Sequence, residues 1–222
     1  MKKLFLLFFI FSGIFLAQED VKYTTAMKKF LSKIDSSLDS PGYISIANGF
    51  ERIAIAEKSK WLPYYYAAFC YTLASYTEEE SIDKDLLLDK AVRFITTADS
   101  IQPDNSEIYT LLGMIAQARM QIDPMNRWMK YGIEAEKHFK KAMELDSLNP
   151  RPEYLIGIGL FYTPAQFGGG PEAARSVLEK SLAKYNLFVP ESDIAPDWGR
   201  EMVVQLLSQI EKQSVTDSAK TK

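Results

Sequence analysis

The sequence of 222 residues contains one cysteine, Cys70, and one histidine, His138. With a single cysteine the chain cannot form an internal disulfide, even in an oxidising compartment. A metal site needs more ligands than one histidine and one nearby carboxylate, so we expect no metal and no other cofactor. Cys70 lies in an apolar stretch, which is typical of a buried packing residue.

The sequence also lacks an excess of basic residues. Lysine and arginine number 26 against 29 acidic residues, and without Lys2 and Lys3 the balance becomes 24 to 29. A nucleic-acid partner would favour a basic stripe, so we expect none. The glycines at 168–170 are followed by Pro171 and not by the lysine of a phosphate-binding loop. No histidine is placed to activate a serine, and we therefore predict that the protein is not an enzyme.

Long hydrophobic runs are missing except at the N-terminus. Met1-Lys2-Lys3 precedes the almost wholly apolar residues 4–17, and polar sequence follows from Gln18. A basic start, an apolar run of about 14 residues and a small residue at its end are typical of a secretory signal peptide. The run is too short to span a bilayer comfortably. We therefore expect residues 1–17 to be removed and the mature protein to be periplasmic or secreted; a retained anchor helix is the alternative.

Between residues 91 and 160 one pattern occurs twice, 44 positions apart. The first copy is Ala91, Ile95, Ala98, Pro103, Tyr109, Leu112, Gly113 and Ala116, and the second includes Ala135, Phe139, Ala142, Ile156, Gly157 and Leu160. Intervals of three, four and seven put each set on one face of a helix. Gly113 and Gly157, with Cys70 in an earlier copy, let neighbouring helices come close. Each unit is then a helical hairpin that buries its apolar face by stacking on the next.

This pattern resembles the tetratricopeptide repeat (TPR) family. The unit of that family is 34 residues, so intervals of 43 and 44 imply about 9 or 10 extra residues between the two helices of a pair. The resemblance implies an all-α solenoid, which we expect to comprise about four hairpins and a C-terminal capping helix over residues 18–211. For residues 212–222 we predict a disordered tail.

In TPR-like stacks, the first helices of the hairpins line a concave groove. Applying the repeat offsets gives the residues of this predicted partner-binding groove: Tyr64, Tyr71, Glu107, Thr110, Met114, Arg151, Tyr154, Ile158 and Phe161. The groove would be rich in aromatic residues, with Glu107 and Arg151 as its charges. The alternative is that the long connectors or the first helix of the chain fill it.

TPR proteins are mostly protein-binding scaffolds, so the resemblance implies a class of function and no chemistry. We predict an exported, non-catalytic scaffold that binds a protein or peptide in the concave groove. The alternative is a periplasmic ligand-handling component of a transport system, similar in plan to the TPR-like components of TRAP-type transporters. An open channel would favour the scaffold, and a closed apolar pocket would favour the ligand carrier.

Overall fold

The computed structural model describes residues 20–34 and 39–220, and within these ranges the chain forms helices and no strand. The predicted signal peptide, residues 1–17, lies outside the described residues. After a helical segment at residues 20–34, the elements are α2 (Ser40–Ala56), α3 (Trp61–Thr77), α4 (Ser81–Ile101), α5 (Ser106–Ile122), α6 (Pro124–Arg127), the π-helix η1 (Trp128–Gly132), α7 (Ile133–Leu145), α8 (Arg151–Tyr162), the 3₁₀ turn η2 (Ala165–Phe167), α9 (Pro171–Tyr185) and α10 (Arg200–Lys220). None of the described helices is long and apolar enough to cross a membrane.

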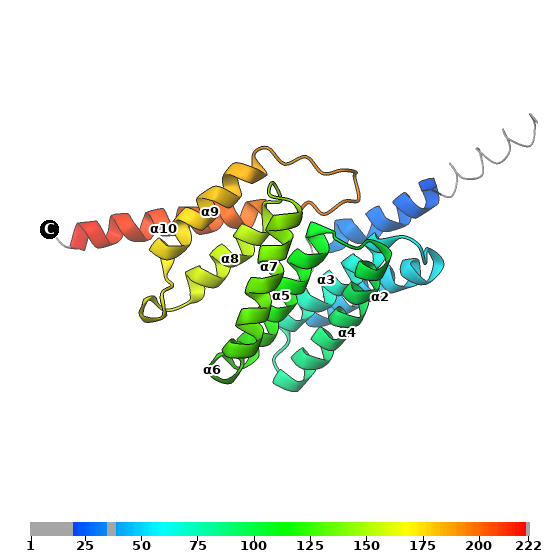
Figure 1. Cartoon of the computed structure of the whole chain (residues 1–222), viewed down its shortest axis with the longest axis horizontal. Helices are drawn as coiled ribbons and strands as arrows, with labels where there is room; N and C mark the ends of the chain where they lie inside the picture. Colours follow the sequence, from blue (N-terminus) through cyan, green and yellow to red (C-terminus); the bar gives the residue numbers. More distant parts are fainter. Residues whose placement is uncertain (1–19, 35–38, 221–222) are drawn as a thin grey trace, which may run out of the picture.

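Helices that follow one another in the chain pack as pairs (Figure 1). The most extensive contacts join α3 to α4, α5 to α7 and α8 to α9, while α2 also packs on α3. The first helices of these pairs, α3, α5 and α8, contact one another in that order. The last helix, α10, packs against α9 and extends to Lys220, so it includes most of the stretch for which the sequence predicts a disordered tail.

Glycines stand where helices approach most closely. A Cβ atom added at Gly113 would lie 2.3 Å from the ring of Phe139, and one added at Gly157 would lie 2.5 Å from the side chain of Leu178. The prediction that Gly113 and Gly157 mark close helix contacts is therefore confirmed. Gly49 of α2 has the same relation to Phe30 of the first helical segment, at 2.3 Å.

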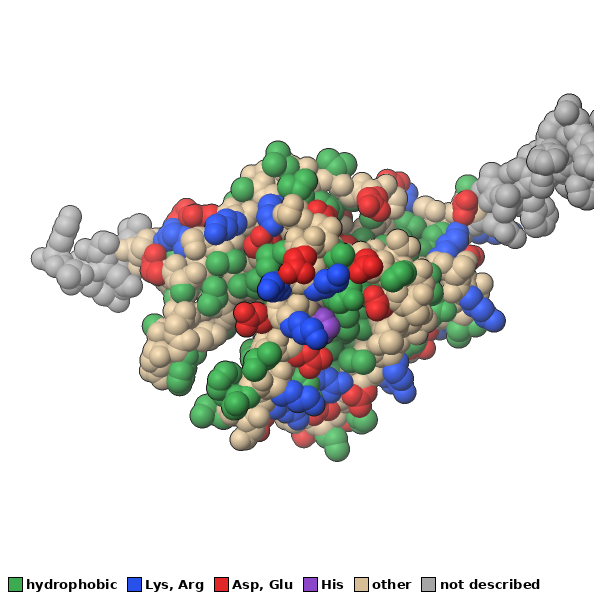
Figure 2. All heavy atoms as spheres, viewed as in Figure 1, with side chains coloured by type: hydrophobic (Ala, Val, Ile, Leu, Met, Phe, Trp, Pro, Cys, Tyr) green, Lys and Arg blue, Asp and Glu red, His purple; other side chains and the backbone are tan. Residues whose placement is uncertain are grey.

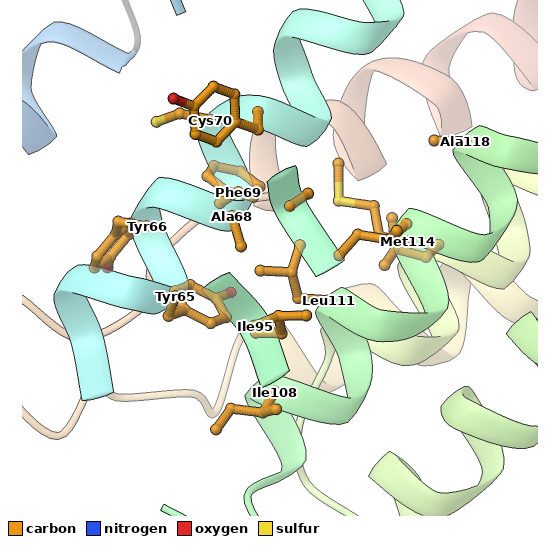
Figure 3. Close-up of a cluster of buried hydrophobic side chains, with 14 of the residues drawn as sticks. Tyr65, Tyr66, Ala68, Phe69, Cys70, Ile95, Ile108, Leu111, Met114 and Ala118 are labelled. Atoms are coloured by element: carbon orange, nitrogen blue, oxygen red, sulfur yellow. The ribbon is translucent and has the colours of Figure 1, made fainter. Parts of the chain in front are cut away.

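One hydrophobic core runs through the stacked helices. Figure 3 shows Phe69 of α3 and Leu111 of α5 in this core, with Ile95 of α4 close to Leu111. Cys70 is fully buried among them, and burial raises the pKa of its thiol. A buried thiol that is hard to deprotonate is a poor nucleophile, which agrees with the packing role expected from the sequence.

Candidate functional site

The structure buries most of the residues predicted to line the groove. Thr110, Tyr71 and Arg151 are fully buried, Tyr154 and Met114 are buried, and Tyr64, Glu107, Ile158 and Phe161 are half-buried. Their surroundings show what covers the Arg151 end of the groove. The connector between α9 and α10, residues 186–199, lies against the first helices of the hairpins, so in this region the alternative of a filled groove describes the structure.

Trp198 is the central contact of this connector. Its indole stacks on Phe69 of α3, with ring centroids 4.9 Å apart, and meets Tyr154 of α8 edge-on at 6.1 Å. The indole Nε1–H donates a hydrogen bond of 3.0 Å to the hydroxyl of Tyr65. A second hydroxyl, that of Tyr66, donates to the carbonyl of Ile194 at 3.0 Å. The connector is therefore fixed by both aromatic packing and hydrogen bonds.

Arg151 and Glu107 form an ion pair beneath the connector. Arg151 Nη1 lies 2.8 Å from Glu107 Oε1, and Arg151 Nη2 donates to the carbonyl of Pro196 at 2.5 Å. Burial raises the pKa of Glu107, and the positive charge of Arg151 opposes that rise. Asn149 donates a further hydrogen bond to Glu107 at 2.8 Å. Glu107 and Arg151, the two charged residues predicted to line an open binding groove, are therefore paired with each other and with neighbouring groups.

The tyrosines of α3 divide between two neighbours, Glu107 of α5 and Phe94 of α4. Tyr65 is the residue of α3 whose hydroxyl reaches Glu107, at 3.5 Å, and Tyr64 does not take that place. Tyr64 and Tyr71 instead pack against Phe94 of α4, with centroid distances of 6.3 and 6.0 Å.

An apolar cleft opens elsewhere, between the α6–η1 end of the second-to-last hairpin and the α8–η2 arm. Figure 2 shows the opening at the lower left, with hydrophobic side chains on both sides. We call this opening the α6–α8 cleft. The large apolar residues that are exposed on these elements and at the start of α7 are Met125, Trp128, Met129, Ile133, Tyr162 and Phe167. None of them was predicted as a site residue, because they fall outside the repeat positions that were used to define the groove.

The wall that carries Trp128 is an irregular part of its helix. Asp123 accepts a hydrogen bond from the backbone N–H of Asn126 at 3.4 Å and so caps α6, in which Pro124 occupies a permitted first-turn position. The five residues of η1 then widen the helix to π geometry, a distortion that occurs often at functional sites. The inference of a site here is supported by this distortion together with the exposed apolar residues.

Charged residues fix the orientation of this wall. Arg127 Nη2 lies 2.7 Å from Asp85 of α4, and Arg119 of α5 joins the same carboxyl group at 3.2 Å. Tyr131 lies on this side as well, with its ring 5.9 Å from the guanidinium of Arg119. Arg127 and Tyr131 thus contact α4 and α5, whereas Trp128 between them is 56% exposed.

The opposite wall begins where α8 leaves α5. Gln117 of α5 donates a hydrogen bond of 3.1 Å to the carbonyl of Leu155, and a Cβ atom at Gly159 would lie 3.0 Å from the Gln117 amide nitrogen. Beyond Gly159 the chain turns through η2 and ends it at Gly168, whose φ of 82° is in the left-handed region that favours glycine. This turn presents Phe167 to solvent at 69% exposure.

Neither wall carries a cluster of His, Cys, Asp and Glu side chains for a bare metal ion. Within residues 20–34 and 39–220 there is no group of three or more His, Cys, Asp or Glu side chains that could hold a metal ion. His138 lies on α7 near Glu134, 3.9 Å away, and the ring of Tyr109, 6.0 Å away, and burial lowers the pKa of its imidazole. The cleft therefore offers aromatic rings and thioethers for contact with an apolar surface.

No protein-family model matches this chain, and no curated protein matches it. Among solved structures the chain is similar to the HusA haemophore from Porphyromonas gingivalis, with 34% sequence identity and a TM-score of 0.76. The match covers 86% of this chain and 94% of the haemophore. The chain belongs to the family of this haemophore. HusA is named as a haem carrier, which is a binding function and not a catalytic one.

Proposed function

We propose that the protein is an exported, non-catalytic carrier of haem or a closely related porphyrin, built as a TPR-like solenoid of helical hairpins. The observation that carries this proposal is the 34% identity to the HusA haemophore over 94% of that protein. Export is supported by the features of residues 1–17.

The α6–α8 cleft is the place where we expect the porphyrin to bind. A porphyrin is flat and apolar on both faces, so it needs two facing walls of apolar side chains. Aromatic rings stack on such a surface, and thioether groups adapt to it. Trp128 and Met129 on one wall are 56% and 64% exposed, and Phe167 on the other is 69% exposed. A group of exposed apolar residues on this scale is typical of a ligand or partner site.

The residues of the cleft also suit the polar parts of haem. Lys130 lies on η1 between the apolar residues, and its ammonium group, which contacts only Tyr131 among the described side chains, is available to a propionate. For the iron, the cleft offers the thioethers of Met125 and Met129 and the phenol of Tyr162, all of types that ligate haem iron in other proteins. His138 is elsewhere on α7.

Titration of the mature protein with haem, followed by the Soret absorbance, tests this assignment. We expect saturable binding, and we expect the double variant Trp128→Ala and Phe167→Ala to bind at least tenfold more weakly. The matched control is Ile55→Ala, which removes a side chain that is 69% exposed on α2, outside the cleft. If the double variant binds haem with wild-type affinity, haem binds outside this cleft. If the wild type does not bind haem, the proposal as a whole is refuted.

A protein or peptide partner in the concave groove stays a second proposal. It requires the connector at residues 186–199 to leave the surface that it covers. The contacts of Trp198 and Arg151 with that surface favour the ligand carrier, which the sequence offered as the alternative to a scaffold.

A further inference from the structure

A second pocket lies on a different part of the molecule, between α2 and α4. It has a volume of about 410 Å³, and its lining comes from three helices: Asn48 and Glu51 of α2, Tyr71 of α3, and Lys90, Arg93, Phe94 and Thr97 of α4. This volume is within the range of small-molecule sites. None of these residues belongs to the α6–α8 cleft.

Tyr71 makes this pocket. It is fully buried on α3, and its hydroxyl reaches Glu51 and Asn48 of α2. The Tyr71 ring stacks on Phe94 at 6.0 Å, and the two rings give the pocket an aromatic floor.

The hydrogen-bonding groups of the pocket are mostly donors. The Tyr71 hydroxyl donates its one proton to Glu51 at 2.5 Å and lies 3.1 Å from Asn48 Oδ1, so this donor is already used within the pocket. Thr97 donates its hydroxyl proton to the carbonyl of Arg93. The donors that are left are the Lys90 ammonium, the Arg93 guanidinium and the Asn48 amide nitrogen.

The two cations have no carboxylate partner among the described residues. No acidic group lies within 4.0 Å of either, whereas Arg119 and Arg127 farther along the chain are both ion-paired. Lys90 sits over the Tyr71 ring at 5.0 Å. The positions of Lys90 and Arg93 differ by three residues, so both side chains project from the same face of α4. Glu51 is the one acidic group in the lining, which leaves a net positive site.

We propose that this pocket binds a small aromatic carboxylate. The carboxylate would accept hydrogen bonds from Arg93 and Lys90, since guanidinium and carboxylate groups pair in two-pronged geometry. The ring would lie on Phe94 and the edge of Tyr71. A bare inorganic anion would satisfy the cations and leave this aromatic floor uncovered.

The test uses benzoate and inorganic phosphate as probes of the full mature protein, followed by amide chemical shifts in NMR. Benzoate at millimolar concentration should give saturable shifts centred on residues 48–51 and 90–97. Lys90→Gln and Arg93→Gln should each weaken its binding at least threefold, and the double variant at least tenfold. Lys84→Gln is the matched control, because Lys84 is a cation on the same helix outside the pocket.

Each other result overturns the proposal. Equal affinities for phosphate and benzoate would show that the rings of Tyr71 and Phe94 do not contribute to binding. If the chemical shift changes caused by benzoate persist unchanged in the double variant, or never appear in the wild type, benzoate does not bind in this pocket. A loss of haem binding in Arg93→Gln would make the pocket part of the haem site. The haem titration of Trp128→Ala and Phe167→Ala is independent, so failure of the proposed function is distinguishable from failure here.

Discussion

Arg151 of α8, which is fully buried, forms an ion pair with the half-buried Glu107 of α5, with 2.8 Å between Nη1 and Oε1. The guanidinium also holds the connector, through the carbonyl of Pro196 and through the rings of Phe188 and Trp198, at 4.6 and 5.4 Å. One side chain thus joins two hairpins to the segment that lies across them. Its burial makes this pair a determinant of stability.

Arg151→Ala should strongly destabilise the protein. Removal of one partner of a buried ion pair leaves the other charge without compensation and typically costs about 3–5 kcal/mol. Glu107 would then be the uncompensated group, and urea denaturation would measure the loss. Replacing both residues, as Arg151→Met with Glu107→Leu, should cost less than Arg151→Ala alone. Wild-type stability in Arg151→Ala would show that the pair is open to water in solution.

The helical repeat could be predicted because it depends on local residue types. Gly113 and Gly157 are small, recur at helical spacing and lie at close contacts, and a neighbour such as Phe139 could be placed from the same pattern. In α3 the same pattern places Cys70 at the glycine position, and this small side chain is fully buried.

Gly113→Leu should lower the free energy of unfolding. A Cβ atom at Gly113 would come within 2.3 Å of the Phe139 ring, and overpacking of a core typically costs about 1–3 kcal/mol. Gly132→Ala is the control, because its Cβ would meet only Met120 Sδ at 3.4 Å and alanine gains up to about 1 kcal/mol of helix propensity. Thermal denaturation separates the two. Equal melting temperatures for wild type and Gly113→Leu would contradict the close contact.

The candidate cleft was harder to predict than the repeat. Trp128, Met129 and Phe167 lie in connecting segments, where no periodicity assigns a side chain to one face or another. The sequence pattern also could not predict that the connector covers the groove, because Trp198 is about 130 residues away from Tyr65 in the chain and contacts it only in the folded protein. Sequence patterns specify neighbours along a helix and say little about long connectors.

Acid should weaken the link between α4 and α6. The hydrogen bonds from Arg127 lower the pKa of Asp85, and the charges of Arg127 and Arg119 add to this, while burial opposes it. Because the folded-state pKa lies below the unfolded value of about 3.9, the unfolded state binds more protons between the two values. The stabilisation is therefore complete above the unfolded pKa and is lost as the pH falls through the folded pKa.

Urea denaturation of wild type and Asp85→Asn at a series of pH values measures this contribution. The difference between the two proteins should be constant near neutral pH and should shrink below about pH 4. Asp83→Asn serves as the control, since Asp83 is exposed on the same helix and outside the ion-pair cluster. A difference that does not change with pH would mean that the carboxylate of Asp85 stays ionised in both states or makes no ion pair in solution.

Trp198→Ala should release the connector from the groove. The substitution removes the stack on Phe69, the contact with Tyr154 and the hydrogen bond to Tyr65, and loss of a packed tryptophan typically costs about 3–5 kcal/mol when it is fully buried. Trp198 is half-buried, so we expect a loss at or below the lower end of that range. Hydrogen exchange followed by mass spectrometry should show faster exchange at residues 188–199, with α2 and α4 unchanged.

Leu187→Ala is the control for this experiment, because Leu187 belongs to the same connector and is 79% exposed. It should leave exchange at wild-type rates, since its side chain has little packing to lose. If Trp198→Ala also exchanges like wild type, the connector is held by Arg151 and the Tyr66–Ile194 hydrogen bond without need of the indole. If the connector is released and the haem titration does not change, the concave groove and the α6–α8 cleft are separate surfaces, as the positions of Trp198 in the connector and Trp128 on η1 lead us to expect.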